Sequence, residues 1–180
     1  MVSVDARRGL LLLVGRALAF QAVFLVLHFA YDWWPGGFTA VFSGIDESVF
    51  QHMKVGYFSW LVVSALEWVA LRPGPALDFA ASRLLGAAFI PPLFAGIWYL
   101  AAAVAGPMPT DLAEIVWANV VIFAASLFTL DIEDHIGSRP MSARLKAYAF
   151  ALAALACFSY VRFSLDAPWV DLFEIPEVTR

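Results

Sequence analysis

The residues of this chain best suited to chemistry lie in a polar run, 44–54, that opens a long apolar segment. The run contains a carboxylate, Glu47, an imidazole, His52, and an ammonium, Lys54. A carboxylate and an imidazole within reach of each other are a common pair for general acid–base catalysis. We predict a catalytic site in which Glu47 and His52 exchange the proton and Lys54 tunes them electrostatically. Glu47, Gln51 and Lys54 are spaced i, i+4 and i+7, which predicts one shared helix face.

The composition explains why this polar run stands out. The chain has 180 residues, of which 62% are hydrophobic and only 14% are charged. Soluble domains carry about 25% charged residues, so this composition is typical of a membrane protein. Ionisable groups in such a protein are costly and usually functional. The net charge is −4 without a basic patch, which argues against nucleic acid as a partner.

Five apolar segments are each long enough to cross ~30 Å of hydrocarbon as a helix. Proline- and glycine-rich turns separate them. Segments of this length satisfy their backbone in lipid only as helices, so we predict an all-α polytopic membrane bundle that forms a single domain. The predicted spans are 9–30, 48–71, 77–105, 112–130 and 145–163, followed by a short acidic tail, 164–180.

Lys and Arg are distributed unevenly among the connections. They flank the N-terminus and the second and fourth connections, whereas 31–46 and 106–111 contain none. Connections rich in Lys and Arg stay in the cytoplasm. We therefore predict that the N-terminus lies inside the cell and the C-terminus outside.

This topology brings polar and aromatic residues from all five predicted helices to one depth, near the outer leaflet. Such convergence is what a ligand pocket requires. The predicted substrate-binding residues are His28, Trp98, Tyr99, Trp117, Asn119 and Tyr160. No cofactor is expected. One alternative is a divalent metal held by His28, Glu47, His52 and Glu114. Another is a structural role, in which Glu47 and Ser48 cap a helix.

A family resemblance covers two segments of this region. Segment 28–33, HFAYDW, and segment 46–54, DESVFQHMK, are separated by one connection. Together they resemble an uncharacterised family of small bacterial multi-pass membrane proteins. Its hallmark is Asn-Glu-Ser-x-x-Glu-His-x-Lys after a His-x-x-Tyr-x-Trp segment. This chain has Asp46 in place of the Asn and Gln51 in place of the second Glu. The resemblance implies a protein of the bacterial cytoplasmic membrane and carries no activity with it.

Three further features lie toward the predicted cytoplasmic side. The acidic run 131–135 follows the fourth span, and we predict a solvated segment balanced by nearby Lys and Arg; a cation site or a docking patch is the alternative. Glu67 and Arg83 are predicted to form an ion pair. Pro91 and Pro92 interrupt the third span, which predicts a kink or a widened cavity.

Three functions are compatible with this pattern. The leading hypothesis is an enzyme that acts by acid–base chemistry on a lipophilic small molecule, an isoprenoid or a lipid, with chemistry like that of a small membrane terpene cyclase. The second is a transporter or proton-coupled channel, which needs a polar route between the outer residues and the acidic run. The third is an accessory subunit that packs through the small residues of 149–156. The expected partners are the lipid bilayer and a lipophilic molecule, and an oligomer or a partner subunit is compatible with each function.

Overall fold

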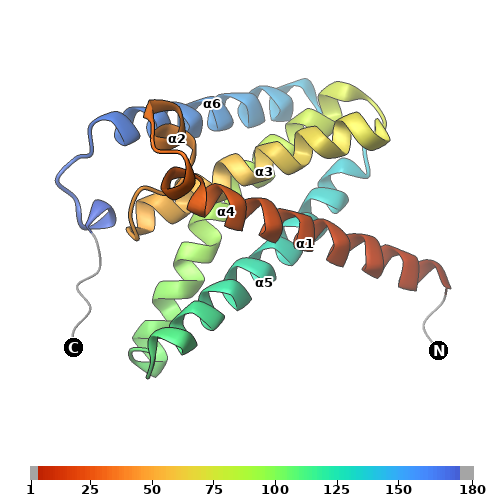
Figure 1. Cartoon of the computed structure of the whole chain (residues 1–180). Helices are drawn as coiled ribbons and strands as arrows, with labels where there is room; N and C mark the ends of the chain where they lie inside the picture. Colours follow the sequence, from red (N-terminus) through yellow and green to blue (C-terminus); the bar gives the residue numbers. More distant parts are fainter. Residues whose placement is uncertain (1–3, 175–180) are drawn as a thin grey trace.

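The computed structural model shows a bundle of long helices, and it describes the backbone of residues 4–174 and the side chains of 9–170 and 172–174 (Figure 1). No strand occurs within those residues, so the predicted all-α class is confirmed. The helices are α1 (Val4–Trp33), α2 (Gly37–Phe42), α3 (Val49–Leu71), α4 (Ala76–Ala105), α5 (Asp111–Gly137) and α6 (Ala143–Leu165), followed by a short 3-10 turn, η1 (Asp171–Phe173).

Five of these helices, α1, α3, α4, α5 and α6, are long and apolar enough to cross a membrane. They run back and forth, so the α3–α4 and α5–α6 connections lie at the end of the bundle near the N-terminus (Figure 1). The α4–α5 connection and α2 lie at the opposite end, where α6 also ends. The predicted polytopic bundle is therefore confirmed.

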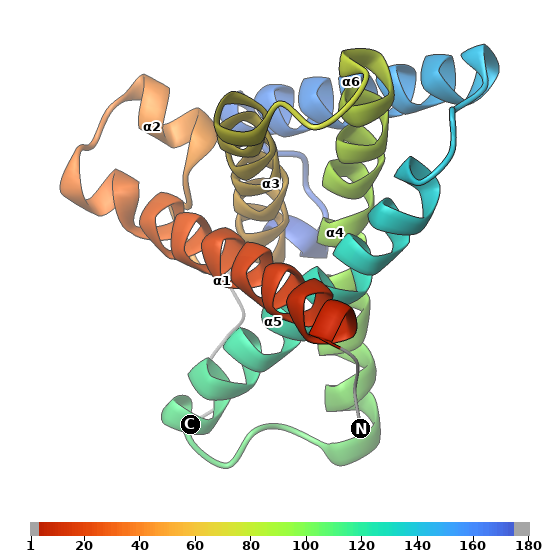
Figure 2. The same ribbon diagram turned by 90° about the vertical axis from the view of Figure 1, so that its right-hand side faces the viewer.

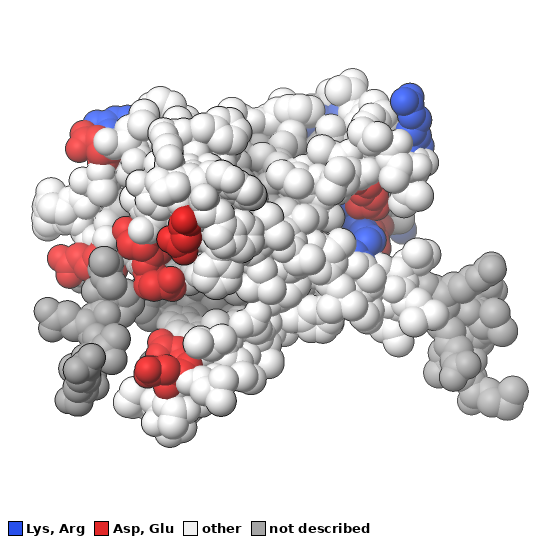
Figure 3. Space-filling view, in the orientation of Figure 1, with Lys and Arg blue, Asp and Glu red and all other residues white. Residues whose placement is uncertain are grey.

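The charged side chains are unevenly distributed between the two ends. In Figure 3, Lys and Arg are seen mainly at the end that carries the N-terminus, and Asp and Glu mainly at the other. This asymmetry restates in space the charge pattern on which we based the orientation. Which end faces the cytoplasm stays a prediction.

Side-chain caps and turn residues set the helix ends. The hydroxyl groups of Ser48, Thr110 and Ser142 accept backbone N–H groups in the first turns of α3, α5 and α6. At its C-terminal end, α3 stops at Arg72, whose φ of 44° lies in the left-handed region, directly before a proline. Gly106, with φ of 81°, ends α4 in front of Pro107.

Helix α4 is the centre of the bundle. It packs against α3, α5 and α6, while α1 packs against α3 and α5 (Figure 2). The core between α1, α3 and α4 is aromatic, with the rings of Phe20, Phe24, Trp60 and Phe94 buried. In lipid the helices gain little from burying apolar surface, so association depends on close packing and hydrogen bonds.

Small residues of α6 contribute to that packing. Ala149 and Ala153 are buried inside this chain's own bundle, and the carbonyl of Ala153 accepts a hydrogen bond of 2.8 Å from the Tyr57 hydroxyl. Ala151 and Ala154 are exposed. At least part of the small-residue stripe of 149–156 therefore serves packing within the chain.

Three local predictions need correction. The connection 31–46 contains a short helix, α2, that its glycine-rich sequence did not indicate. The predicted fourth span, 112–130, continues as α5 to Gly137, so the acidic run 131–135 is helical. The tail begins later than predicted, at Asp166, and Phe173 folds back to stack on Phe50 with ring centroids 4.3 Å apart. Residues 175–180 of the predicted tail lie outside the described residues.

Pro91 and Pro92 lie inside α4, which stays helical through them. Beside them is a groove of about 300 Å³ between α4, α5 and α6, lined by residues that include Ala88, Phe89 and Pro92. This groove faces α5 and α6, and Tyr99 is not among its lining residues, so a cavity widened by the prolines stays a prediction.

Candidate functional site: a histidine–glutamate cluster

Three segments bring three ionisable side chains together. His28 lies near the end of α1, His52 lies in the first turn of α3, and Glu47 lies in the connection between α2 and α3. The short helix α2 turns the chain back, so that this connection runs beside the end of α1. We call His28, Glu47 and His52 the histidine–glutamate cluster.

The carboxylate oxygens of Glu47 and the Nε2 atoms of the two histidines face one another. Glu47 Oε1 lies 3.5 Å from His28 Nε2, and Glu47 Oε2 lies 3.4 Å from His52 Nε2. One donor atom from each residue can be chosen so that all lie within 4.8 Å of one another. The side chain of Glu47 is 68% exposed, whereas those of His28 and His52 are 13% and 28% exposed. The cluster therefore has two half-buried imidazoles and one open side.

His52 is held in one orientation by its own helix. Its Nδ1 lies 2.9 Å from the carbonyl oxygen of Ser48. A carbonyl oxygen only accepts, so Nδ1 carries the hydrogen and donates it. In a neutral imidazole this leaves a bare lone pair on Nε2, the atom that faces Glu47. Two acceptors then face each other, and a cation between them would relieve that arrangement.

His28 is held by packing. Its ring stacks on Phe24, with centroids 6.2 Å apart and planes within 10° of each other, and it meets the edge of Phe29 at 4.7 Å. Its Nδ1 is buried and has no hydrogen-bond partner among the described residues. A Cβ at Gly44 would come within 3.4 Å of this atom, so the chain passes closely over the ring.

The backbone around Glu47 is fixed by hydrogen bonds on both sides. Asp46 Oδ1 accepts the N–H of Ser48 at 2.8 Å, and Ser48 Oγ accepts the N–H of Gln51 at 3.4 Å. Ser48 is the N-cap of α3, so Glu47 precedes the helix. The predicted helix face shared by Glu47, Gln51 and Lys54 is therefore wrong, because helical spacing does not extend to Glu47.

Lys54 contacts another part of the molecule. Its side chain is fully buried, and its Nζ donates to the carbonyl of Ala40 at 2.8 Å. That carbonyl lies near the C-terminal end of α2, where a positive charge stabilises the helix. The structure thus gives Lys54 a contact with α2 and does not bring it into the cluster.

The predicted substrate-binding residues are spread over the bundle. Asn119 accepts a hydrogen bond from Gln21 at 2.6 Å, and Tyr160 packs on Tyr57 with centroids 5.2 Å apart. Trp98 and Trp117 are half-buried, and Tyr99 and Glu114 are exposed. Of the residues predicted to bind substrate or metal, the structure brings His28, Glu47 and His52 together.

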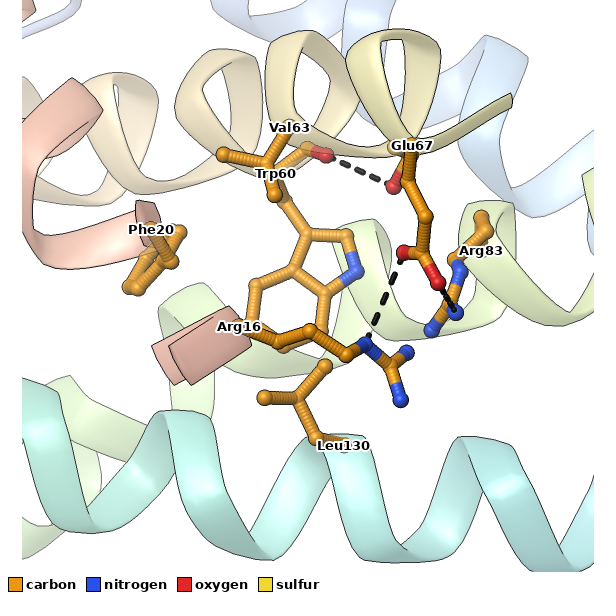
Figure 4. A pocket seen from close by; sticks show the side chains of 8 residues that line it. Arg16, Phe20, Trp60, Val63, Glu67, Arg83 and Leu130 are labelled. Carbon is orange, nitrogen blue, oxygen red and sulfur yellow. Dashed lines mark hydrogen bonds and ion pairs between the residues drawn. The ribbon is translucent and has the colours of Figure 1, made fainter. Parts of the chain in front are cut away.

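A second group of charged residues was only partly predicted. Arg83 donates to Glu67 at 2.9 Å, which confirms the predicted pair (Figure 4). The same guanidinium also pairs with Glu133, and Arg16 contacts Glu67 at 3.5 Å. We call Arg16, Glu67, Arg83, Glu133 and Asp134 the arginine–carboxylate network.

Glu133 is the centre of this network. It is 3% exposed and accepts a hydrogen bond of 2.8 Å from Trp60 Nε1. The carboxylate passes α4 at Gly86, where any Cβ would overlap it. The prediction that the acidic run is solvated is therefore wrong for Glu133 and holds for Asp131, Asp134 and His135, which are exposed.

The sequence did contain a signal for the network. Arg16 and Glu133 lie inside long apolar helices, where charged residues pair with one another or face a cavity. Arg16 pairs with Asp134 through contacts of 2.8 and 2.9 Å. A cavity of about 10 Å³, the size of one water molecule, lies between Arg16, Ser64, Glu67 and Arg83 (Figure 4).

Comparisons with known proteins add no assignment: no family model, no curated protein and no solved structure matches the chain. The resemblance to an uncharacterised bacterial membrane family stays a prediction that rests on residues 28–33 and 46–54.

Proposed function

We propose that this chain is a membrane-embedded enzyme that acts by acid–base chemistry on a lipophilic small molecule, an isoprenoid or a lipid. The histidine–glutamate cluster is the site of the reaction, and it faces the outer leaflet of a bacterial cytoplasmic membrane. The single observation that carries this proposal is the convergence of two imidazoles and a carboxylate, from three chain segments, at an open end of the bundle. The stability of the helix bundle does not require two imidazoles and a carboxylate to face one another.

The surroundings of the cluster suit a substrate with a long apolar part. Phe29, Trp33 and Ile45 lie on the same segments as the cluster residues and are 43%, 54% and 42% exposed. Of these, Trp33 is of a type that is enriched at the membrane–water boundary. An apolar tail would lie against them in the lipid, while a polar head reaches Glu47 from the aqueous side.

The open side of the cluster favours some reactions over others. A cyclase must surround a carbocation with aromatic walls, whereas the side chain of Glu47 is 68% exposed. Hydrolysis and proton-transfer isomerisation tolerate or require water at the site. We therefore favour these two reactions over the cyclisation considered from the sequence.

A transporter is less well supported by the packing. The cluster and the arginine–carboxylate network lie at different depths, and the buried rings of Phe20, Phe24 and Phe94 pack between α1, α3 and α4. A route for a polar substrate or a proton would need polar groups or water along this stretch.

The proposal is tested by activity on lipids. Purified protein in nanodiscs is incubated with a bacterial polar lipid extract supplemented with polyprenyl alcohols and polyprenyl phosphates, and products are followed by mass spectrometry. We expect the wild type to convert at least one component and Glu47→Gln to lose that conversion. Glu174→Gln, a matched change in the exposed tail, should keep it. No conversion by the wild type, or equal conversion by Glu47→Gln, would overturn the proposal.

A further inference from the structure

We infer that the histidine–glutamate cluster is a binding site for a divalent transition metal, with zinc as the best fit. His28 Nε2, His52 Nε2 and a carboxylate oxygen of Glu47 are the protein ligands, and a water molecule takes the fourth position. This inference deepens the proposed function, on which its catalytic meaning rests, by naming the cofactor of the same site.

The distances favour a metal over direct hydrogen bonds. The two Glu47–histidine contacts are 3.5 and 3.4 Å, whereas an N–H···O hydrogen bond is usually about 2.7–3.2 Å. Ligands held about 2.0–2.2 Å from a tetrahedral zinc stand about 3.3–3.6 Å apart. Octahedral ligands at about 2.1 Å would stand closer, near 3.0 Å. Each histidine lies at the tetrahedral spacing from one Glu47 oxygen, and one atom from each of the three residues lies within 4.8 Å of the others.

The orientation of His52 leads to the same conclusion. Because Nδ1 donates to the carbonyl of Ser48 at 2.9 Å, the ring offers Nε2 to the cluster as a lone pair. Histidine ligands in metal sites are commonly oriented by such a hydrogen bond from the other ring nitrogen. The hydrogen bond to the Ser48 carbonyl thus orients the His52 ring as a ligand in the metal-free protein.

The donor set and the charge select the metal. Two imidazoles and one carboxylate suit zinc and neighbouring transition metals, and they suit magnesium and calcium poorly. The ligands carry one negative charge, which a divalent cation more than balances. Three protein ligands with one open position are typical of catalytic zinc rather than structural zinc.

An open position gives the site its chemistry. A water bound to zinc loses a proton to the solvent near neutral pH and becomes a bound hydroxide. This hydroxide is then the base or nucleophile of the proposed reaction, and Glu47 and the two histidines hold the ion. The 68% exposure of the Glu47 side chain leaves room for water on that side.

Cobalt is the probe for the test, because Co²⁺ fits zinc sites and absorbs visible light when four-coordinate. Protein stripped of metal with a chelator is titrated with CoCl₂ in detergent. We expect one equivalent of Co²⁺ to give the four-coordinate spectrum and ZnCl₂ to remove it. His28→Ala, His52→Ala and Glu47→Gln should lose the spectrum. His135→Ala, which changes the exposed histidine at the other end of the bundle, should keep it, as should Glu114→Gln.

Glu47→Gln keeps the experiment decisive where a histidine variant fails to fold, because Glu47 is exposed and its replacement disturbs no packing. No spectrum in the wild type, or a spectrum that survives Glu47→Gln and His52→Ala, would overturn the inference. The two proposals fail separately. Metal binding without lipid conversion rejects the enzyme and keeps the metal site, whereas full conversion by stripped protein rejects the metal site and keeps the enzyme.

Discussion

The histidine–glutamate cluster and the arginine–carboxylate network are two answers to the same problem, that of ionisable groups in an apolar bundle. In the network every carboxylate meets an arginine, and Glu133 also accepts a hydrogen bond from Trp60. In the cluster the donor atoms face one another at 3.4–3.5 Å, with one side open. In the network the charges of both signs come from the chain itself, whereas we propose that the cluster takes its positive charge from a bound cation.

This difference separates a structural from a chemical use of charge. Paired buried charges join helices, and removing one of them leaves its partner exposed to an apolar surrounding. The network links α1, α3, α4 and α5 in this way. The cluster links fewer helices, and its imidazole and carboxylate atoms point toward one common position. We therefore expect substitutions in the network to change stability and substitutions in the cluster to change binding.

The largest effect on stability is expected from Arg83→Gln. Arg83 pairs with both Glu67 and Glu133, so its loss leaves the Glu133 carboxylate short of a partner in the core. Breaking a buried pair from one side costs about 3–5 kcal/mol. Denaturant unfolding in detergent measures the change. Arg162→Gln is the control, because Arg162, in the last turn of α6, pairs with Asp166 at an exposed position directly after the helix, and it should cost about 1 kcal/mol or less. Equal losses in both variants would show that the network does not carry the stability we assign to it.

Gly86→Ala should have the next largest effect. Its Cβ would overlap the Glu133 carboxylate and approach Trp60 Nε1 at 2.8 Å, which forces both to move. Overpacking of this kind costs about 1–3 kcal/mol. Gly96→Ala is the matched control in the same helix, because a Cβ there meets nothing within 4 Å. The control should be neutral or slightly stabilising. Thermal unfolding of the two variants measures the difference in stability. A Gly86→Ala variant as stable as the wild type would contradict the close approach of the Glu133 carboxylate to Gly86.

Ser48→Ala tests the backbone that supports the cluster. It removes the hydroxyl that accepts the N–H of Gln51, and loss of an N-cap costs about 1 kcal/mol. The Ser48 carbonyl that orients His52 is retained, so binding of Co²⁺ should persist. Unfolding and cobalt titration on the same sample separate the two effects. Loss of cobalt binding here would mean that the hydroxyl, rather than the carbonyl, prepares the site.

The smallest effect on stability is expected from His52→Ala in metal-free protein. The side chain is 28% exposed and its only hydrogen bond in the described residues is to its own helix, so the cost should be about 0.5 kcal/mol or less. The same substitution should abolish cobalt binding. A loss as large as that of Arg83→Gln would place His52 among the structural residues and remove the contrast between the two regions.

Much of the fold was predictable from length and turn chemistry. The apolar stretches and the proline–glycine connections identified the five long helices, because the lipid core admits few other structures. Helix α2 was missed because it is only six residues long and begins with a glycine, so it shows no helical pattern of apolar residues. Glu133 was missed because the acidic run was taken to follow the helix. Once α5 continues to Gly137, helical geometry turns Glu133 inward and Asp134 outward.

The sequence could predict the site only where the order of the helices determines which helix ends lie close together. His28 and His52 were brought together because the ends of neighbouring helices meet. Lys54 was assigned to the same site from helical spacing, which fails because α3 begins at Val49, after Glu47. The aromatic residues of α4 and α5 share a predicted depth with the cluster, but depth does not determine which side of a bundle a residue faces.

The most direct test of the central claim is the thermal unfolding of metal-free protein with and without Zn²⁺. A ligand that binds only the folded state stabilises it, by about 2.7 kcal/mol at 100 times its Kd. We expect Zn²⁺ to raise the Tm of the wild type and of Arg162→Gln, and to leave the Tm of Glu47→Gln unchanged. An unchanged wild type, or an equal rise in Glu47→Gln, would contradict a metal site at the histidine–glutamate cluster.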